Sequence, residues 1–336
     1  MLKNITVSPA PHISAQLSTC SVMIDVIIAL VPAVAAAGYY FRIYAIVLIS
    51  TCVISAVVTE WLCNKIRKKP DSLGDFSAVV TGIILALSLP PSLPFWAAII
   101  GSVFAISIGK MVFGGLGSNI FNPAMVGRAF LTACFGILMT TWTVPATLNP
   151  KMPKIAADNI VHARTQATPL AWSKQAIKTK TGAEIVNKQL EAAFTGEIGG
   201  CLGETSAIAL LIGGLYLLIK RTINPHIPLA VALSAFVFAA IAYLINPDTY
   251  ILPVTHLYSG GLLLCIFFIA TDPVTAPLTA KGMWIFGVGV GTITMLIRIV
   301  GEYPEGVMFS VLLMNALTPL IDRFCKLVPA GGKPSA

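Results

Sequence analysis

Four acidic residues stand inside or beside long apolar stretches, where carboxylates are rare. Asp25 lies within the first apolar stretch, Asp272 follows another and precedes Pro273, and Asp75 and Glu204 each come two residues before an apolar run. An ionised carboxylate is costly in a bilayer and usually faces a wet cavity or an ion pathway. Acids just before a helix also cap its free N–H groups, an alternative that stays open for Asp75 and Glu204. These positions predict a route for a cation or proton.

Motifs for other reactive centres are absent from the sequence. The Gly-rich stretch 114–117 lacks the Lys-Ser/Thr pair of a phosphate-binding loop. The four histidines, at 12, 162, 226 and 256, are too widely spaced to suggest a metal site. There is no nucleophile elbow and no dinucleotide fingerprint. The sequence therefore predicts neither a catalytic side chain nor a metal centre.

The seven cysteines form no C-x-x-C pair, and most stand in apolar stretches, where a lone cysteine behaves as a small apolar residue. Cys134 and Cys201 are different because they flank a long polar segment. Whether either contacts a partner protein or simply packs is left open by the sequence.

Composition predicts an all-α, polytopic membrane protein. Of its 336 residues 56% are hydrophobic and only 11% are charged, with a mean hydropathy of +0.85; soluble domains carry about 25% charged residues. About 20 apolar residues cross a bilayer as a helix, so we expect about ten transmembrane helices, the first of them uncleaved. The apolar stretches are 20–40, 43–63, 77–90, 95–113, 125–142, 202–219, 229–245, 257–270, 283–300 and 307–321.

Basic residues predict the orientation. They concentrate in every second loop and at the C-terminus, which places both termini in the cytoplasm and the segment 144–200 outside. The net charge of +8 follows from this asymmetry and from the basic external loop, so no nucleic-acid partner is needed. The residues that fix the orientation are Lys65, Arg67, Lys68, Lys69, Lys110, Lys220, Arg221, Lys281, Arg323, Lys326 and Lys333.

An internal repeat divides the chain. "LGDFSA" (73–78) resembles "LGETSA" (202–207), and Gly-Gly-Leu followed by Asn/Asp-Pro occurs later in each half. Three expected spans separate the two boxes, and this odd number predicts an inverted repeat, with a site between broken helices at its interface. We expect four parts: an N-terminal membrane half (1–143), the external loop (144–200), a C-terminal membrane half (201–325) and a cytoplasmic tail (326–336).

Five sequence blocks carry a family resemblance. They are "DFSAVVTGIILALSLPPSLPFW", "GGLGSNIFNPAMVGRAF", "GETSAIALLIGG", "FFIATDPVTAP" and "EYPEGVMFSVLLMNALTPLID". Together they resemble the D subunit of the bacterial Rnf ion-translocating oxidoreductase and, more distantly, the B subunit of the sodium-pumping NADH:quinone oxidoreductase. The resemblance covers nearly the whole chain and implies a fold like that of urea transporters.

The resemblance implies a covalent flavin in the external loop. In these subunits a flavin transferase joins FMN through its phosphate to a threonine in Asp-x-x-Ser/Thr-Gly-Ala-Thr. The acceptor here is Thr168, with Thr165 and Ala167 matching the pattern, whereas His162 and Gln166 replace its acid and its glycine. Because glycine fits backbone shapes closed to glutamine, the loop bend is expected to differ slightly. The resemblance also suggests a second, non-covalently held riboflavin.

The resemblance further implies a redox-driven ion pump in the bacterial cytoplasmic membrane. The complex, with A, B, C, E and G subunits, would couple electron transfer between ferredoxin and NAD to Na⁺ or H⁺ movement. Asp75, Asp272 and Asp322 match acids tied to ion passage in the related sodium pump, and Asp25 is added for its expected depth. Two alternatives stay open: a flavin-free secondary transporter or channel of the same fold, and a cofactor-free scaffold subunit.

Overall fold

The computed structural model is helical. The residues that it describes contain no strand, which confirms the all-α class. They are 18–68, 72–142, 170, 173–174, 177, 200–204, 206–301, 303 and 305–326.

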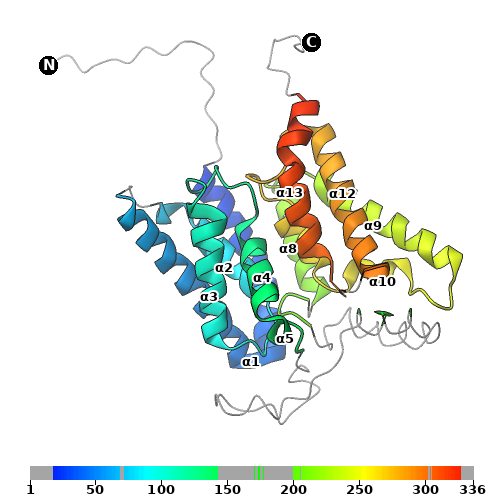
Figure 1. The fold of residues 1–336 in the computed structure, drawn as a ribbon, viewed down its shortest axis with the longest axis horizontal. Coiled ribbons are helices and arrows are strands. Elements are labelled where there is room, and N and C mark those ends of the chain that lie inside the picture. The colour runs from blue at the N-terminus through cyan, green and yellow to red at the C-terminus, as the bar shows by residue number, and fades with distance from the viewer. Residues whose placement is uncertain are drawn as a thin grey trace.

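The first helix, α1 (Thr19–Ile66), consists of two arms joined at a single residue. Its 48 residues would extend for about 72 Å if straight, more than twice the ~30 Å hydrocarbon core of a bilayer. Arg42 interrupts the helix with φ 57° and ψ −145°, and the second arm returns toward the end at which the first begins (Figure 1). The two predicted stretches 20–40 and 43–63 are therefore both helical and meet without a loop.

Short helices follow. Asn122 caps α4 by accepting hydrogen bonds from the N–H groups of Ala124 and Met125, and Pro123 occupies the first helical turn, where its missing N–H costs nothing. The helices of this part are α2 (Ser77–Leu87), α3 (Phe95–Ile106) continued by the π-helix η2 (Ser107–Met111), α4 (Pro123–Cys134) and α5 (Gly136–Met139).

The rest of the chain contains both short and long helices. Ser206 caps α8 through the N–H of Ala209, and Thr279 caps α12 through the N–H of Gly282. The helices are α8 (Ala207–Ile219), α9 (His226–Ile245), α10 (Pro253–Tyr258), α11 (Leu262–Leu264) continued by the π-helix η4 (Cys265–Ile269), α12 (Ala280–Ile299) and α13 (Val307–Phe324).

Every one of the ten predicted apolar stretches contains helix. Four of the described helices, α1, α9, α12 and α13, are long and apolar enough to cross a membrane by length and composition. The segments α2, α3 with η2, and α8 are apolar but shorter. The prediction of helices is thus confirmed, and the number of spans stays a prediction.

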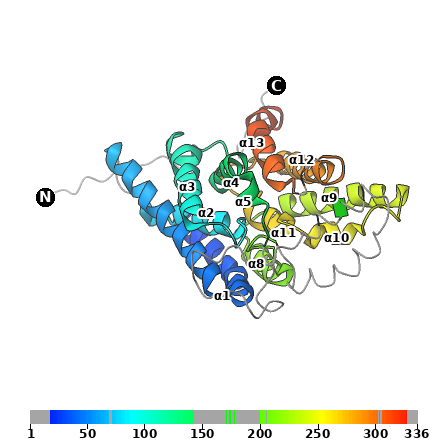
Figure 2. The ribbon, with the colours of Figure 1, turned by 60° about the horizontal axis from the view of Figure 1, so that its bottom comes forward.

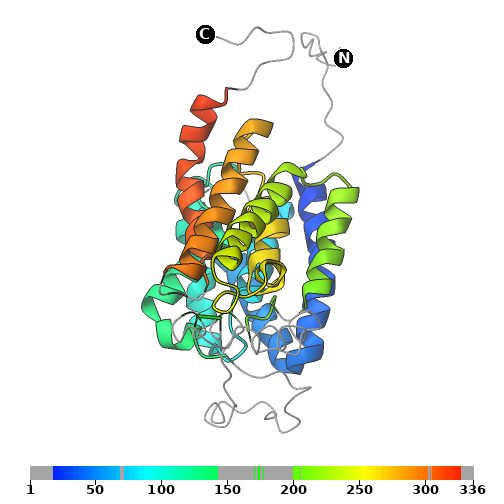
Figure 3. The ribbon, with the colours of Figure 1, turned by 90° about the vertical axis from the view of Figure 1, so that its right-hand side faces the viewer.

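Two groups of helices lie side by side. α1 packs against α2, α3 and α8, while α12 packs against α9 and α13 (Figures 1 and 2). The first turn of α1 and the last turn of α13 lie at the same end of the molecule, the upper end in Figures 1 and 3. We call this the terminal end. The opposite end carries the turn at Arg42, α5 and the start of α13.

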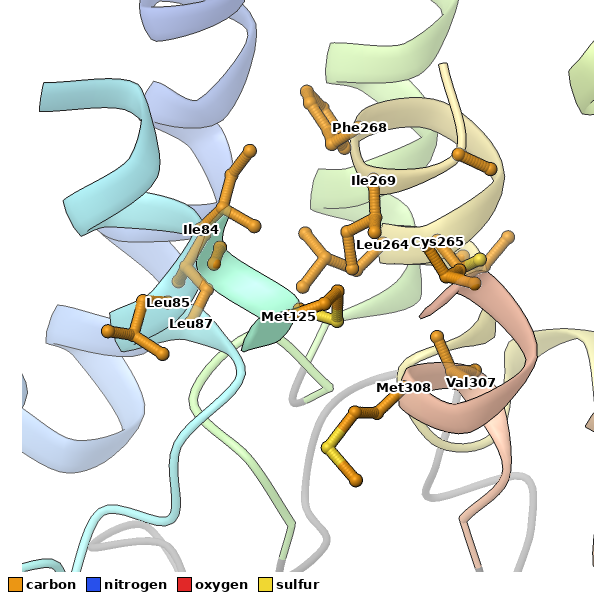
Figure 4. Packing of buried hydrophobic residues seen from close by; sticks show 14 of the residues in the cluster. Ile84, Leu85, Leu87, Met125, Leu264, Cys265, Phe268, Ile269, Val307 and Met308 are labelled. Atoms are coloured by element: carbon orange, nitrogen blue, oxygen red, sulfur yellow. The ribbon is translucent and has the colours of Figure 1, made fainter. Parts of the chain in front are cut away.

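Apolar side chains fill the space where the groups meet. Ile84 and Leu87 of α2 face Met125 of α4, with Leu264 and Ile269 from the other group nearby (Figure 4). These residues are buried and belong to one continuous cluster. Burial of these apolar side chains stabilises the contact between the two groups of helices.

Candidate functional site

A small cavity of about 70 Å³, with apolar and polar side chains in its wall, lies between the two groups of helices near the terminal end. Residues from both groups form its wall. The first turns of α1 contribute apolar side chains, and the polar lining includes Ser77, Lys110, Asn119, Asn122, Thr222 and Asp272. Hydroxyl, amide and carboxylate groups in an otherwise apolar interior suit a hydrated ion better than an apolar ligand.

Of the four predicted ion-path acids, only Asp272 lines this cavity. It follows η4, and its carboxylate accepts hydrogen bonds from the N–H of Val274 at 3.2 Å and the hydroxyl of Thr275 at 3.1 Å. Both bonds fix the carboxylate on the turn beside the cavity. Of the four acids, Asp272 is therefore the one whose side chain lies beside the cavity between the two groups of helices.

Asp25 and Asp75 do not line the cavity, but each forms a hydrogen bond with a residue that does. Asp25 lies six residues after the start of α1, about 9 Å along the helix, so it is shallower than the sequence suggested. It pairs with Lys220 and accepts a hydrogen bond from Thr222, which lines the cavity. Asp75 accepts from the N–H of Ser77, the first residue of α2, at 2.8 Å, while Phe76 stands at the N-cap position of that helix.

Asp322 lies apart from the other three. It stands near the end of α13 and accepts a hydrogen bond from the N–H of Leu278 at 3.2 Å. Leu278 immediately precedes the cap of α12, so this contact ties α13 to the start of α12. The structure gives Asp322 a role in holding two helices together and does not bring it to the cavity.

A buried ion pair adjoins the cavity, and sequence analysis missed it. The distribution of basic residues predicts that Lys110 lies in a cytoplasmic loop, but in the structure it is buried in η2. Its ammonium nitrogen lies 2.7 Å from Oε2 of Glu60. The Lys110 side chain is 1% exposed and that of Glu60 is 0% exposed. The sequence does show Glu60 within the apolar stretch 43–63 and Lys110 within the stretch 95–113. It does not show that these two charged side chains meet.

A second polar cluster lies toward the opposite end of the molecule. Arg298, at the end of α12, donates to the carbonyl oxygens of His256 at 2.7 Å and Ser259 at 3.0 Å, and lies 3.2 Å from the carboxylate of Glu305. The other carboxylate oxygen of Glu305 accepts from the N–H of Gly261 at 3.1 Å. These bonds lock the turn between α10 and α11 onto the loop before α13.

Arg128 and Glu204 complete this cluster. Arg128 of α4 donates to the sulfur of Cys201 at 3.5 Å, and Oε2 of Glu204 accepts from the N–H of Cys201 at 3.3 Å. Since Ser206 caps α8, the capping role considered for Glu204 is wrong. Arg128, Cys201, Glu204, Arg298 and Glu305, which we call the arginine cluster, therefore come from segments far apart in sequence.

The carboxyl groups of the arginine cluster differ in protonation. Glu204 and Glu305 lie in connecting segments, outside the helices. Burial and the neighbouring Glu305 carboxylate raise the pKa of Glu204 to about 8. Burial alone would raise the pKa of Glu305 as well, but the guanidinium groups of Arg298 and Arg128 outweigh it and lower that pKa. The two guanidinium groups thus favour the ionised form of Glu305, whereas burial favours the protonated form of Glu204.

Leu170, a described residue of the predicted flavin loop, lies beside the arginine cluster. Leu170 is 5% exposed, and a Cβ atom added to Gly260 would lie 2.6 Å from its Cδ1 and 2.7 Å from Nη2 of Arg298. Gly260 also has φ +70°, which favours glycine. The predicted acceptor Thr168, with Thr165 and Ala167, lies outside the described residues.

The two cysteines that flank the polar segment differ in environment. Cys201 is buried against Arg128, whereas Cys134, the last residue of α4, is exposed. Packing within the chain accounts for Cys201. The thiol of Cys134 lies at the surface of the chain.

Comparison with known proteins places the chain in a family. Residues 6–331 match the model of the NQR2, RnfD, RnfE family. The chain is 47% identical to the D subunit of the Na⁺-translocating ferredoxin:NAD⁺ oxidoreductase complex of Acetobacterium woodii, over 96% of this chain and 94% of that protein. It is 43% identical to the D subunit of the proton-translocating ferredoxin:NAD⁺ oxidoreductase complex of Clostridium ljungdahlii, over 98% and 97%. It is also 38% identical to the D subunit of the ion-translocating oxidoreductase complex of Erwinia tasmaniensis, over 95% and 96%. A helical chain whose polar residues gather between packed helices, and which matches these proteins along nearly its whole length, belongs to the NQR2, RnfD, RnfE family.

Proposed function

We propose that this chain is the D subunit of an Rnf-type complex that couples electron transfer between ferredoxin and NAD to cation translocation. The observation that carries this proposal is the near-complete match to the D subunits of three ion-translocating oxidoreductases, at 38–47% identity. The A, B, C, E and G subunits would be its partners in the bacterial cytoplasmic membrane. Ten spans, an inverted repeat, cytoplasmic termini and an external loop 144–200 belong to the same proposal.

The proposed cofactor is FMN, attached through its phosphate to Thr168 by a flavin transferase. Leu170, two residues further along the chain, packs against Gly260 beside Arg298 and Glu305. The arginine cluster holds two guanidinium groups, those of Arg128 and Arg298, which suit a phosphodiester or a reduced, anionic flavin ring. Thus the described residues fit the group. A flavin supplies the redox chemistry, and the protein supplies position and electrostatics. A non-covalent riboflavin within the helices is proposed on the family resemblance alone.

The proposed cation route includes the cavity beside Asp272. The polar side chains among its lining residues and its place between two groups of helices support this role. Asp25 and Asp75 contribute through Thr222 and Ser77, while Asp322 is the weakest of the four candidates because it does not line the cavity. Relatives at 47% and 43% identity are named for Na⁺ and for protons, so similarity to them does not select the ion.

Flavin fluorescence of the denatured chain tests the cofactor. The complex would be produced together with a flavin transferase, denatured, separated by electrophoresis and illuminated with ultraviolet light. A fluorescent wild-type band that is lost in Thr168→Ala and kept in Thr179→Ala, which changes a threonine outside the motif, would establish the acceptor. A dark wild-type band would favour the flavin-free transporter. Flavin that is retained while Thr168→Ala leaves electron transfer intact would favour the scaffold.

A further inference from the structure

The buried ion pair between Glu60 and Lys110 has the ligand set of a cation site. The ammonium nitrogen of Lys110 donates to Oε1 of Glu60 at 2.8 Å, to Oε2 at 2.7 Å and to the hydroxyl of Ser77 at 2.6 Å. An ammonium group has three donors, so all of them are used. The hydroxyl of Ser72 adds a hydrogen bond to Oε1 at 2.5 Å. Carboxylate and hydroxyl oxygens thus surround one positive charge.

Because Glu60 is buried, its carboxylate needs a positive charge beside it. Both side chains are essentially inaccessible, and an isolated ion in a low-dielectric interior is strongly destabilised because it has lost its hydration. Removing one partner of such a pair leaves an uncompensated charge, which must be neutralised by a proton or by another ion. The Glu60 carboxylate therefore requires either Lys110 or a substitute for it.

The pair is connected to the cavity. Lys110 and Ser77 both line it, so the ammonium group links the cavity wall to Glu60. Asn119 also lines the cavity and is 5% exposed, and its Oδ1 is a buried acceptor with no hydrogen-bond partner among the described residues. Buried acceptors are normally paired, so an unpaired amide oxygen beside this cavity indicates a site for a missing donor or cation.

We propose that Lys110 is a tethered cation occupying a monovalent metal-cation site at Glu60, and that a mobile cation entering from the cavity competes with its ammonium group. Oxygen ligands of this kind suit hard cations such as Na⁺ or Li⁺. The inference deepens the proposed cation route and rests on it. In one state Lys110 binds Glu60; in the other a mobile cation takes Glu60 and Lys110 is displaced toward the cavity. Only one positive charge is held by Glu60 at a time.

Removal of the tethered charge tests the competition. Lys110→Met would be made in the complete purified complex, and Tm would be measured in NaCl, LiCl or choline chloride at constant ionic strength. A cation that binds only the folded state raises Tm as its concentration rises. We expect a saturable rise of several degrees with Na⁺ or Li⁺ over choline in Lys110→Met, and a much smaller rise in the wild type.

Two further variants separate the site from general salt effects. In the double variant Lys110→Met with Glu60→Gln both charges are absent, and the Na⁺-dependent rise should disappear. Lys65→Met removes an exposed lysine and should behave as the wild type does. The proposal is overturned if Lys110→Met responds to Na⁺ no more than the wild type, if the double variant keeps the rise, or if only acid stabilises Lys110→Met.

Failure to assemble is also informative. If Lys110→Met does not assemble in cells and buffers that contain Na⁺ while the neutral double variant does, a mobile cation cannot replace the ammonium group, and the proposal fails. The flavin experiment is independent of these measurements. A covalent flavin on Thr168 without Na⁺-dependent stabilisation of Lys110→Met would leave the proposed function standing and remove this inference alone.

Discussion

The N–H of Gly203 donates a hydrogen bond of 2.7 Å to the carbonyl oxygen of Leu87. The next residue back, Leu202, donates to the carbonyl oxygen of Leu89 at 3.1 Å. The end of α2 is thereby joined to the segment that leads into α8, more than 100 positions away. Backbone groups left free where a helix stops inside an apolar environment must find partners. Here the carbonyl oxygens at the end of α2 are paired with N–H groups of the segment before α8.

Gly203→Ala should weaken this junction. A Cβ atom at Gly203 would lie 3.0 Å from the carbonyl oxygen of Leu87 and 3.1 Å from its Cβ. Crowding of this kind costs about 1–3 kcal/mol in a packed interior. We expect a lower Tm for the detergent-purified complex. Gly74→Ala, where a new Cβ would meet nothing within 4 Å, is the matched control; equal losses in both variants would argue against crowding.

Gly260→Ala should disturb the contact between Leu170 and the arginine cluster. The added Cβ would approach Cδ1 of Leu170 to 2.6 Å and Nη2 of Arg298 to 2.7 Å, and the backbone has φ +70°. Gly115→Ala separates the two causes, because Gly115 has φ +111° but open space around it. Backbone strain alone costs roughly 1–3 kcal/mol. We expect the larger loss of Tm, and faster proteolysis near residue 170, in Gly260→Ala; similar behaviour of both would leave strain as the whole effect.

Glu204 should exchange a proton near pH 8. Burial and Glu305 raise its pKa to about 8, so the folded protein holds a proton that the unfolded chain releases at lower pH. Its contribution to the free energy of unfolding is therefore greatest in acid and falls as pH rises from the ordinary glutamate value to about 8. Infrared spectra should show a protonated-carboxyl band that fades through about pH 8 and is missing in Glu204→Gln. A band unchanged by this substitution would assign the proton elsewhere.

Asp272→Asn and Asp322→Asn should differ in transport. Asp272 lines the cavity, whereas Asp322 holds the N–H of Leu278. Each ~1.4 kcal/mol added to a barrier slows a step about tenfold. We expect ferredoxin-driven cation uptake into proteoliposomes to fall at least about tenfold in Asp272→Asn and only slightly in Asp322→Asn. The reverse order would move the route away from the cavity and toward the end of α13.

Local features of the sequence determined which segments are helical. Hydrophobic stretches of sufficient length must satisfy their backbone groups internally, and caps such as Asn122 fix where a helix begins. The same stretches gave the class of the protein, and five sequence blocks indicated the family. Asp272 could be singled out because a carboxylate next to an apolar stretch is rare wherever it occurs.

Tertiary structure decided which polar groups meet. Glu60 and Lys110 are 50 residues apart, and Arg128 and Cys201 are 73 apart, so no periodicity within one segment relates them. Likewise Arg42 turns a 48-residue helix back on itself, Asp75 binds the N–H of Ser77 at the start of α2, and Asp322 binds the N–H of Leu278 just before α12. Helix formation depends on neighbours within a few positions of the chain, whereas the partner of a buried charge depends on how distant helices pack. The sequence alone therefore determined the elements, and packing between them determined the sites.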